Sequence, residues 1–368
     1  YKEAVNHEGQ PTVVLAKTVK GWALGKGFEA RNMTHQKKDL GKSDWQYFRD
    51  LLEIPFTDSE LEGMPYYKPV ADSEEIRYLM ERRKELGGHL PKRKVAYSGF
   101  KMPNRVAFTE FDKGTPENQE VSTTMAFVRL LRNLMKDEKI GNLIVPIVPD
   151  EARTFGMEAL FTEFKIYNAQ GQIYTPVDSE LLLSYKESES GQILEEGISE
   201  AGAMSSFTAA GTAYANVGKP TIPFYIYYSM FGFQRVGDQI WCAADSRARG
   251  FLLGATAGRT TLNGEGLQHQ DGHSLLTATT VPNCIAYDPA FAYEIGVIIK
   301  EGLRRMYDNN EDLFYYLTLY NENYAMPPIP KNCEKGIIQG IYKLKNMRNA
   351  DLRLIGSGSI MQQILKAS

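Results

Sequence analysis

The chain has 368 residues, 43% of them hydrophobic and 11% aromatic, and its 42 basic side chains nearly balance 45 acidic ones for a net charge of -3. This length allows two or three domains with buried cores, while the charge balance disfavours a nucleic-acid or anionic-membrane partner. The three cysteines lack CxxC spacing and no apolar run approaches roughly 20 residues, so we expect a soluble cytoplasmic protein without a disulfide framework, zinc cluster or membrane span.

The first part of the chain combines one apolar run with several helical patterns. The run PTVVLAKTV, residues 11–19, is typical of a buried strand. Three helical stretches follow, and Ser43, Asp58 and Ser73 are their predicted N-caps. The periodic pattern is lost between residues 89 and 118, which predicts a first domain boundary.

Helices alternate with apolar strands through the middle of the chain. The expected strands cover residues 142–150, 221–229, 251–258, 283–288 and 313–319. The expected helices cover residues 123–137, 198–215, 234–249 and 290–307, with a further helix that begins near Thr154. Because these strands are apolar throughout, their order favours an α/β fold whose parallel sheet is covered on both faces.

The last part of the chain has a less complete pattern. The proline-rich stretch PPIPK, residues 327–331, predicts a second domain boundary. The stretch DLRLIGSGS, residues 351–359, is typical of a strand and a turn, and the helix expected after it has barely begun at Ser368. Since the chain also starts with Tyr1, we expect it to be an internal piece of a longer polypeptide.

Four polar stretches follow predicted strands of the middle segment. They are residues 148–156, 227–235, 264–273 and 287–291. Ligands of parallel sheets collect at the carboxyl ends of the strands. One polar loop would carry little weight, but four together suggest a single functional rim.

The stretch HQDGH places His269 and His273 four residues apart, as in the zinc motif HExxH. That motif requires an uninterrupted helix, whereas Asp271 and Gly272 oppose helix formation here and Gln270 replaces the glutamate. A loop that brings an imidazole to a small anionic substrate fits this stretch better than zinc does. A hydrogen-bonded surface turn is the alternative interpretation.

Glu200 is the only acidic residue among the small side chains of GISEAGAMSSFTAAG, residues 197–211. A buried, unpaired carboxyl group takes up a proton and then donates a hydrogen bond at neutral pH. The alternative is a glutamate at a helix N-terminus, stabilised by the helix dipole. Phe231 and Phe233 flank a glycine where a strand ends, and are either core residues or a flat face for a planar ring.

Six long motifs resemble the homodimeric bacterial pyruvate dehydrogenases, the decarboxylating first component of the pyruvate dehydrogenase complex. These are DEARTFGMEALF, GQILEEGISEAGA, IPFYIYYSMFGFQRVGD, RTTLNGEGLQHQDGHS, IAYDPAFAYE and LIGSGS. The resemblance covers almost the entire chain and implies a transketolase-like α/β fold. It implies the end of a diphosphate-binding domain (1–99), a complete pyrimidine-binding middle domain (100–329) and the start of a C-terminal domain (330–368).

The resemblance assigns roles around bound thiamine diphosphate. Glu200 matches the glutamate that hydrogen-bonds N1′ of the aminopyrimidine, Phe231 matches the aromatic residue packed on that ring, and Ile198 belongs to the same wall. Tyr228 and His269 match residues near the reacting carbon and the substrate carboxylate. Further residues that match positions close to the site are Asp150, Glu151, Arg235 and Glu265.

Two further segments resemble mobile loops of this family. Lys20 and the stretch GFEARNMTH belong to a loop that closes over the bound intermediate, where Glu29 and His35 are partners and His35 assists acetyl transfer. Residues 170–186 resemble its neighbouring loop. Such closure excludes water from the site.

The resemblance implies oxidative decarboxylation of pyruvate with reductive acetylation of the lipoyl domain of a dihydrolipoyl acyltransferase, carried out by a homodimer. The family's GDG…N signature, which holds Mg²⁺ and the diphosphate, is expected upstream of residue 1, so no metal ligand is assigned here and this piece alone is expected to be inactive. The alternatives are a related thiamine-dependent 2-oxoacid decarboxylase or transketolase, and a non-catalytic dimerisation or docking fragment.

Overall fold

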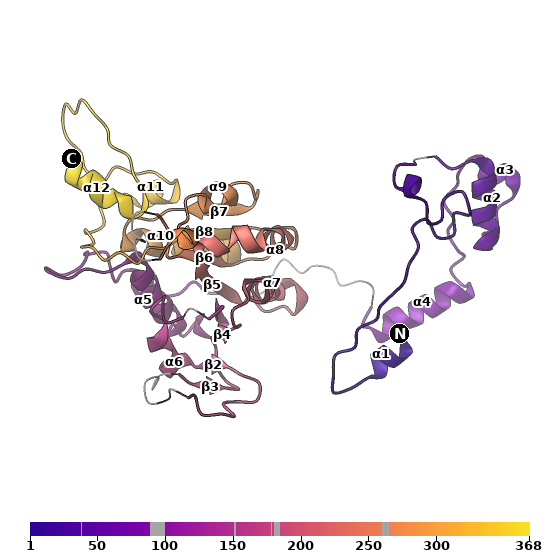
Figure 1. Ribbon diagram of the computed structural model, residues 1–368, viewed down its shortest axis with the longest axis horizontal. Helices are drawn as coiled ribbons and strands as arrows, with labels where there is room; N and C mark the ends of the chain where they lie inside the picture. The colour runs from indigo at the N-terminus through magenta and orange to yellow at the C-terminus, as the bar shows by residue number, and fades with distance from the viewer. Residues whose placement is uncertain are drawn as a thin grey trace. The chain divides into compact units, whose positions relative to one another are not determined.

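The computed structural model describes residues 1–37, 39–88, 100–150, 152–177, 179, 185–259, 262 and 265–368. The chain folds as two compact units, residues 1–91 and 92–368 (Figure 1). No helix in these described ranges is both long enough and apolar enough to cross a bilayer.

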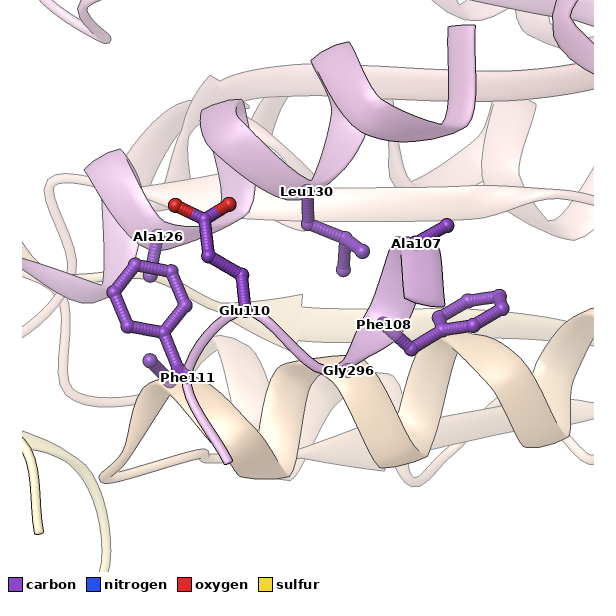
Figure 2. Close-up of a pocket in the computed structure, with 8 residues that line it drawn as sticks. Ala107, Phe108, Glu110, Phe111, Ala126, Leu130 and Gly296 are labelled. Atoms are coloured by element: carbon purple, nitrogen blue, oxygen red, sulfur yellow. The ribbon is translucent and has the colours of Figure 1, made fainter. Parts of the chain in front are cut away.

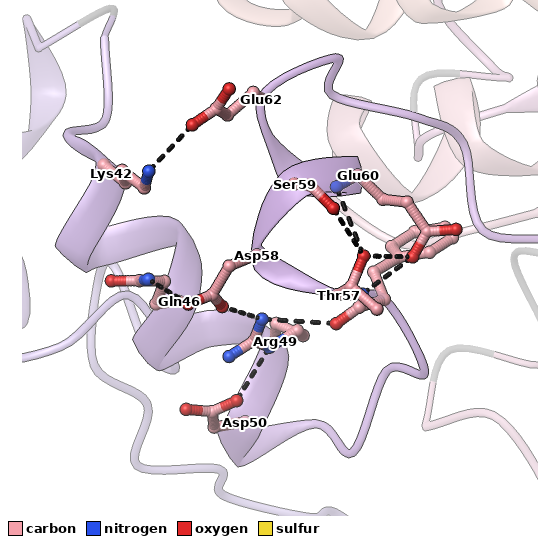
Figure 3. Close-up of polar contacts among 10 residues, drawn as sticks. Lys42, Gln46, Arg49, Asp50, Thr57, Asp58, Ser59, Glu60 and Glu62 are labelled. Carbon is pink, nitrogen blue, oxygen red and sulfur yellow. Dashed lines mark hydrogen bonds and ion pairs between the residues drawn. The ribbon is translucent and has the colours of Figure 1, made fainter.

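The first unit consists of short helices joined by loops. They are α1 (Lys2–Asn6), the 3-10 turn η1 (Asn32–His35), α2 (Lys42–Leu51), α3 (Asp58–Leu61) and α4 (Glu74–Glu85). Neither α2 nor α3 contains a fully buried residue, and polar contacts join them (Figure 3). Arg49 donates to Asp58 at 2.5 Å, and Lys42 donates to Glu62 at 2.8 Å.

The three helices predicted for this unit are confirmed, and Ser73 caps α4 as expected. The cap predicted for α3 is wrong. Thr57, not Asp58, accepts the backbone N–H of Glu60 at 3.4 Å, and the Glu60 carboxylate accepts the N–H of Thr57 at 2.8 Å. The cap predicted for α2 is also wrong, because this helix begins one residue before Ser43. The carboxylate of an aspartate in its first turn accepts the backbone N–H of the glycine that precedes the helix.

The buried strand predicted at residues 11–19 is also wrong. These residues have no regular structure, and Val13 and Leu15 are 79% and 93% exposed. A strand needs a neighbouring strand for its backbone hydrogen bonds. The described residues of the first unit contain no strand, so the apolar run has nothing to pair with there.

The second unit is built on a six-stranded sheet with the order β4-β1-β5-β6-β8-β7, in which every pair of neighbours is parallel. These strands are β1 (Ile144–Val148), β4 (Leu194–Glu195), β5 (Ile222–Tyr228), β6 (Phe251–Ala255), β7 (Cys284–Tyr287) and β8 (Phe314–Thr318). A separate parallel pair consists of β2 (Ile166–Tyr167) and β3 (Glu187–Ser188).

Helices of very different lengths surround this sheet (Figure 1). They are α5 (Thr123–Met135), α6 (Glu158–Phe164), α7 (Glu200–Asn216), α8 (Phe233–Asp245), α9 (Ser274–Ala278), α10 (Ala292–Leu303), α11 (Glu334–Ile338) and α12 (Met361–Ala367). Short 3-10 turns are η2 (Arg105–Phe108), η3 (Gly141–Leu143), η4 (Ser229–Phe231), η5 (Leu267–His269) and η7 (Gly358–Ile360), and a π-helical turn, η6 (Arg304–Asp308), extends α10.

Two apolar cores cover the two faces of the six-stranded sheet. On one face, Phe224, Phe251 and Tyr315 occupy neighbouring positions on β5, β6 and β8 and pack with residues of α5 and α10. The rings of Phe224 and Phe251 are stacked with their centroids 4.7 Å apart. On the other face, Tyr225 and Tyr316 pack with residues of α7 and α8. The predicted α/β fold, with a parallel sheet covered on both faces, is therefore confirmed.

Two predicted elements of this unit need correction. The helix expected from Thr154 begins at Glu158, because Gly156 has a left-handed φ of +69° that interrupts a helical path. The strand expected within residues 351–359 is wrong: Leu352 and Ile355 are 74% and 75% exposed and lie outside any strand. Within the described residues this segment pairs with no strand of the sheet.

Candidate functional site

Four rings meet beyond the carboxyl ends of β1, β5 and β6, which are neighbours in the sheet. The centroid of the Tyr228 ring lies 5.5 Å from Phe155, 5.7 Å from Phe231 and 5.0 Å from His269. The Phe231 and His269 rings are 5.3 Å apart. We call these four side chains the aromatic cluster. Because parallel strands end at the same edge, three of the predicted polar loops are brought together here.

The fourth polar loop, residues 287–291, binds a different part of the chain. It follows β7, which is separated from β6 by β8. Asp288 in this loop accepts hydrogen bonds from Thr318 at 2.5 Å, Tyr320 at 2.7 Å and Ser357 at 2.5 Å. The prediction of one rim from all four loops is therefore only partly right, because strand order in the sheet decides which loops are neighbours.

Glu200 is the first residue of α7 and is only 8% exposed. The hydroxyl of Ser199 accepts the backbone N–H of Gly202 at 3.1 Å and so caps the helix. Both interpretations of Glu200 are thus correct in part, since it is buried and also lies at a helix N-terminus. The expectation that its carboxylate is unpaired is wrong, because the guanidinium of Arg235 donates to it at 2.8 Å.

Arg235 connects Glu200 to the aromatic cluster. Its guanidinium carbon lies 3.9 Å from the centroid of the Phe231 ring, a cation–π contact. The Arg235 side chain is 50% exposed, whereas that of Glu200 is 10% exposed. A buried acid, a half-exposed cation and an aromatic face therefore adjoin one another at the carboxyl edge of the sheet.

His269 faces this group from the loop after β6. Its Nδ1 atom lies 3.0 Å from the carbonyl oxygen of Glu265 and 3.8 Å from a carboxylate oxygen of the same residue. The His269 side chain is 22% exposed, so it is accessible to a small molecule. The site thus offers one accessible imidazole beside aromatic surfaces.

The two histidines of HQDGH lie in separate turns. His269 ends η5, while His273 directly precedes α9 and its Nδ1 lies 3.6 Å from Asp271. The continuous helix that an HExxH site requires is therefore not formed by residues 265–273. In the described ranges, no group of three or more His, Cys, Asp or Glu residues is arranged to hold a metal ion.

The other predicted site residues of the second unit lie outside the aromatic cluster. Ile198 is two residues before Glu200 and its side chain is 79% exposed. Asp150 is exposed and follows β1 by two residues, while Glu151 lies outside the described residues. The roles assigned to these three residues stay predictions.

Two of the three site residues predicted in the first unit are in contact with each other. The Nζ atom of Lys20 lies 2.5 Å from Nδ1 of His35. The carboxylate of Glu29 instead accepts the backbone N–H of Ala23 at 2.9 Å, which fixes the turn between them. Their proposed roles in loop closure and acetyl transfer stay predictions.

Sequence reasoning missed two parts of the site. Phe155 lies within a predicted polar loop, but the pattern gave no reason to separate it from core phenylalanines. Asp271, Ser274 and Tyr316 form a buried polar cluster that begins two residues after His269. Tyr316 lies in an apolar strand 42 residues after Ser274, so only the register of β8 brings these two residues together.

A small hollow on the second unit is unrelated to the aromatic cluster. It lies among η2, α5 and α10. Figure 2 shows its lining side chains, which are mostly apolar and include Phe108, Phe111 and Leu130, with the carboxylate of Glu110 among them. None of the predicted site residues contributes to this lining, and the space inside it is only about that of one water molecule.

Comparisons with known proteins identify relatives of this chain. The family described as pyruvate dehydrogenase E1 component middle domain matches residues 105–327. Over its full length the chain is 53% identical to a pyruvate dehydrogenase E1 component of Pseudomonas aeruginosa, 54% to one of Mycobacterium tuberculosis and 48% to one of Escherichia coli. It spans only 42%, 40% and 42% of the lengths of those three proteins.

The fold is similar to that of transketolases. The Leishmania mexicana enzyme matches with a TM-score of 0.57 at 15% identity, covering 90% of this chain and 42% of that one. The Campylobacter jejuni enzyme matches with a TM-score of 0.54 at 15% identity, covering 86% and 43%. These two likenesses concern the fold alone, whereas the sequence matches identify the family. The chain belongs to the pyruvate dehydrogenase E1 component family, and residues 105–327 correspond to its middle domain.

Proposed function

We propose that the full-length polypeptide containing this chain catalyses thiamine-diphosphate-dependent oxidative decarboxylation of pyruvate, with transfer of the acetyl group to a lipoyl domain. The observation that carries the proposal is the arrangement of Glu200, Arg235 and the aromatic cluster at the carboxyl ends of three parallel strands. The high identity to proteins named pyruvate dehydrogenase E1 component supports the same reaction class. Because the chain spans about two-fifths of those proteins, the activity is proposed for the longer polypeptide.

The proposed reaction balances without a further oxidant. The bond between the carbonyl carbon and the carboxylate of pyruvate breaks, and carbon dioxide leaves. The electron pair left behind reduces the lipoyl disulfide, so one sulfur forms an acetyl thioester and the other, with one proton, becomes a thiol. The acyltransferase component is therefore the partner that accepts the product.

The buried acid and the aromatic face fit the aminopyrimidine part of the cofactor. Thiamine diphosphate, when bound, supplies a carbon nucleophile for the ketone and takes up the electrons of decarboxylation. Glu200 would hydrogen-bond ring atom N1′, Phe231 would pack against the ring, and Tyr228 lies beside Phe231 in the aromatic cluster. The Mg²⁺ and diphosphate ligands are proposed to come from residues outside this chain.

A ring bound to Glu200 has to share that carboxylate with Arg235, or displace it. The arginine is half exposed and has a flexible stem, so it can move without disturbing α7 or the core. Its planar guanidinium occupies the face of Phe231 that a planar ligand would use. We therefore propose that Arg235 covers the pyrimidine position in the free chain.

His269 is proposed to act on the substrate. It lies next to Tyr228 and Phe231, and its imidazole can donate a hydrogen bond to a carboxylate or carbonyl oxygen of pyruvate. The nearby Glu265 contacts the imidazole through its backbone oxygen and orients the ring. Asp150 and Glu151 are proposed to approach the same substrate from the loop after β1.

We infer a cytoplasmic homodimer in which a second subunit completes the site. Ile198, Leu267 and Leu276 lie near α7 or the His269 loop and are 79%, 82% and 74% exposed. Exposed apolar side chains close to a functional site are typical of a surface covered by a partner. Lys20, Glu29 and His35 are proposed to belong to the loop that closes the site.

The test compares the full-length polypeptide with its Glu200→Ala and Glu200→Gln variants. Pyruvate-dependent release of carbon dioxide is measured with thiamine diphosphate and Mg²⁺, and cofactor binding is followed by calorimetry. We expect release to fall about 100-fold or more in Glu200→Ala, because loss of a positioned proton-transfer group costs about 10²–10⁴-fold. Glu301→Gln, which changes a carboxylate paired with Arg304 on α10, is the control and should keep full activity.

Two outcomes would contradict the proposal in different ways. Activity that survives in Glu200→Ala would contradict the role given to that carboxylate. A wild-type polypeptide that binds no thiamine diphosphate and releases no carbon dioxide would favour a dimerisation or docking function.

A further inference from the structure

The loop that carries His269 is fixed at both of its ends. Upstream, Thr256 directly follows β6 and has a φ of +50°, a left-handed conformation that is unusual for a β-branched residue. Its hydroxyl accepts a hydrogen bond from the Asn321 side chain at 3.2 Å. Downstream, the loop ends where α9 begins at Ser274, only five residues after His269.

Asp271 forms the downstream anchor. Its side chain is 4% exposed and accepts the backbone N–H groups of His273 and Ser274, each at 3.0 Å. The same carboxylate accepts the hydroxyl of Ser274. Tyr316 of β8 donates to that hydroxyl at 2.8 Å, and its ring is fully buried in the sheet. The loop is thereby connected to the central sheet through one carboxylate, one serine and one tyrosine.

Burial by itself would raise the pKa of Asp271. The hydrogen bonds from Ser274 and from the backbone together have the larger effect, so the pKa lies below its usual value. The carboxylate therefore remains ionised near neutral pH. Hydrogen bonds to a charged acceptor are about twice as strong as neutral ones. The anchor is accordingly stiffer than a turn held by neutral groups.

The position of His269 follows from this anchor. Only Gln270 lies between the two residues, so the two Cα atoms cannot be more than about 7 Å apart. The contacts that His269 makes within its own turn involve Glu265, which is exposed, and the neighbouring Leu267 is 82% exposed. The exposed side of the turn therefore offers little rigidity, and the buried side, at Asp271, supplies it.

We propose that Asp271 is a positioning residue that holds the imidazole of His269 against Tyr228 and Phe231, an inference that rests on the proposed action of His269 on the substrate. Asp271 is 5% exposed and its oxygens bind the start of α9, so it acts through His269 and does not touch the substrate. A catalytic group displaced by about 1 Å loses about 100-fold in rate. Removing the anchor should therefore resemble a partial loss of His269.

A double-mutant cycle in the full-length polypeptide tests this inference. The cycle compares wild type, Asp271→Asn, His269→Ala and the double variant, with kcat and KM for pyruvate-dependent carbon dioxide release measured for each. We expect Asp271→Asn to lower kcat/KM about 10- to 100-fold in the wild-type background and to add almost nothing once His269 is absent. Ser274→Ala removes the hydroxyl that joins Asp271 to Tyr316, and should give a smaller loss with the same dependence on His269.

A matched control separates positioning from general stability. Glu294 is also a buried carboxylate that accepts backbone N–H groups at the start of a helix, but it lies on α10, which packs in the other core from Tyr316. Both Asp271→Asn and Glu294→Gln should change the melting temperature, whereas only Asp271→Asn should change kcat/KM. If Asp271→Asn does not fold, Ser274→Ala takes its place in the double-mutant cycle with His269→Ala.

The outcomes distinguish this inference from the proposed function. If His269→Ala retains full activity, the action of His269 in the proposed function is wrong, and this inference is overturned with it. If His269→Ala is impaired but neither Asp271→Asn nor Ser274→Ala is, the proposed function stands and the positioning role is overturned. The positioning role is also overturned if Asp271→Asn lowers kcat/KM equally with and without His269, because Asp271 would then act by another route.

Discussion

The guanidinium of Arg235 donates a 2.8 Å hydrogen bond to the buried carboxylate of Glu200. The same guanidinium lies 3.9 Å from the centre of the Phe231 ring. A single half-exposed cation therefore binds both groups that we assign to a planar ligand. Under the proposed function, a planar ligand would have to share these groups with Arg235 or displace it.

Replacement of Arg235 by methionine should destabilise the second unit slightly. The variant keeps the apolar stem over Phe231 but leaves the Glu200 carboxylate without this partner. A hydrogen bond between charged groups contributes about 1.5–3 kcal/mol, and solvent screening of the half-exposed arginine reduces the expected loss to about 1 kcal/mol. The midpoint of denaturant unfolding measures this change.

Arg247→Met is the matched control for that variant. Arg247 is 52% exposed, close to the 50% of Arg235, but its partner Asp312 is 31% exposed at a distance of 3.3 Å. The Arg247 variant should unfold at nearly the wild-type midpoint. Equal shifts for the two arginines would mean that burial of Glu200 does not strengthen its ion pair.

The sheet of this protein could be predicted from sequence because its strands are apolar and its helices amphipathic. β5 and β6 lie within their predicted ranges, and the helix that begins at Glu200 was expected within two residues of its observed start. Local pattern failed at residues 11–19 and 351–359, where short apolar runs also predicted strands. A strand is stabilised by its neighbours, and in these two segments the described residues provide none.

The site was harder to predict than the fold. Glu200, Phe231 and His269 were assigned by motif and their roles stay predictions, but the ion pair from Arg235 depends on the side-chain directions of α7 and α8. No property of a linear pattern reports such a contact between residues 35 positions apart. The link from Asp271 through Ser274 to Tyr316 has the same origin, since it depends on strand register.

Gly254→Ala should disrupt the buried polar cluster of Asp271, Ser274 and Tyr316. Gly254 lies within β6, and a methyl group there would collide with the hydroxyl of Tyr316. Tyr316 would have to move away from Ser274, so the amide of Ser274 should exchange faster with deuterium. Overpacking of a core costs about 1–3 kcal/mol, and a lower melting temperature is expected.

Gly237→Ala provides the comparison for this substitution. A methyl group at Gly237 on α8 would meet no atom within 4 Å. Alanine is favoured over glycine within a helix by about 0.5–1 kcal/mol, so the melting temperature should stay constant or rise. An unchanged melting temperature and an unchanged Ser274 amide in Gly254→Ala would contradict the predicted collision.

Glu187→Ala should loosen the base of the segment between β2 and β3. The Glu187 carboxylate accepts hydrogen bonds from Tyr174 at 2.6 Å and from Tyr185 at 2.9 Å, so it joins two residues that are eleven positions apart. Loss of one to two kcal/mol of such contacts raises the open population about 5- to 30-fold. Limited proteolysis next to Tyr174 and Tyr185 should accelerate by a similar factor, whereas Glu189→Ala, at an exposed turn position, should be cleaved at the wild-type rate.

Glu294 should make the stability of the second unit dependent on pH. Burial raises the pKa of this carboxyl from 4.5 to about 7, although Tyr342 and the backbone of Ala290 donate hydrogen bonds to it at 2.5 and 2.7 Å. Because the folded state favours the protonated form, the stabilising contribution is complete below pH 4.5 and is lost as the pH rises through 7. A shift of this size corresponds to roughly 3 kcal/mol.

Glu294→Gln removes this titration while keeping a neutral group of the same shape. The denaturant midpoint of the variant, relative to wild type, should therefore rise steadily between pH 4.5 and 7 and remain level at lower pH. Glu301→Gln changes another carboxylate of α10, which is paired with Arg304 near the surface, and should show no such trend in this interval. A constant difference between wild type and Glu294→Gln across the interval would mean that Glu294 is ionised throughout, so that its bonds to Tyr342 and Ala290 outweigh the effect of burial.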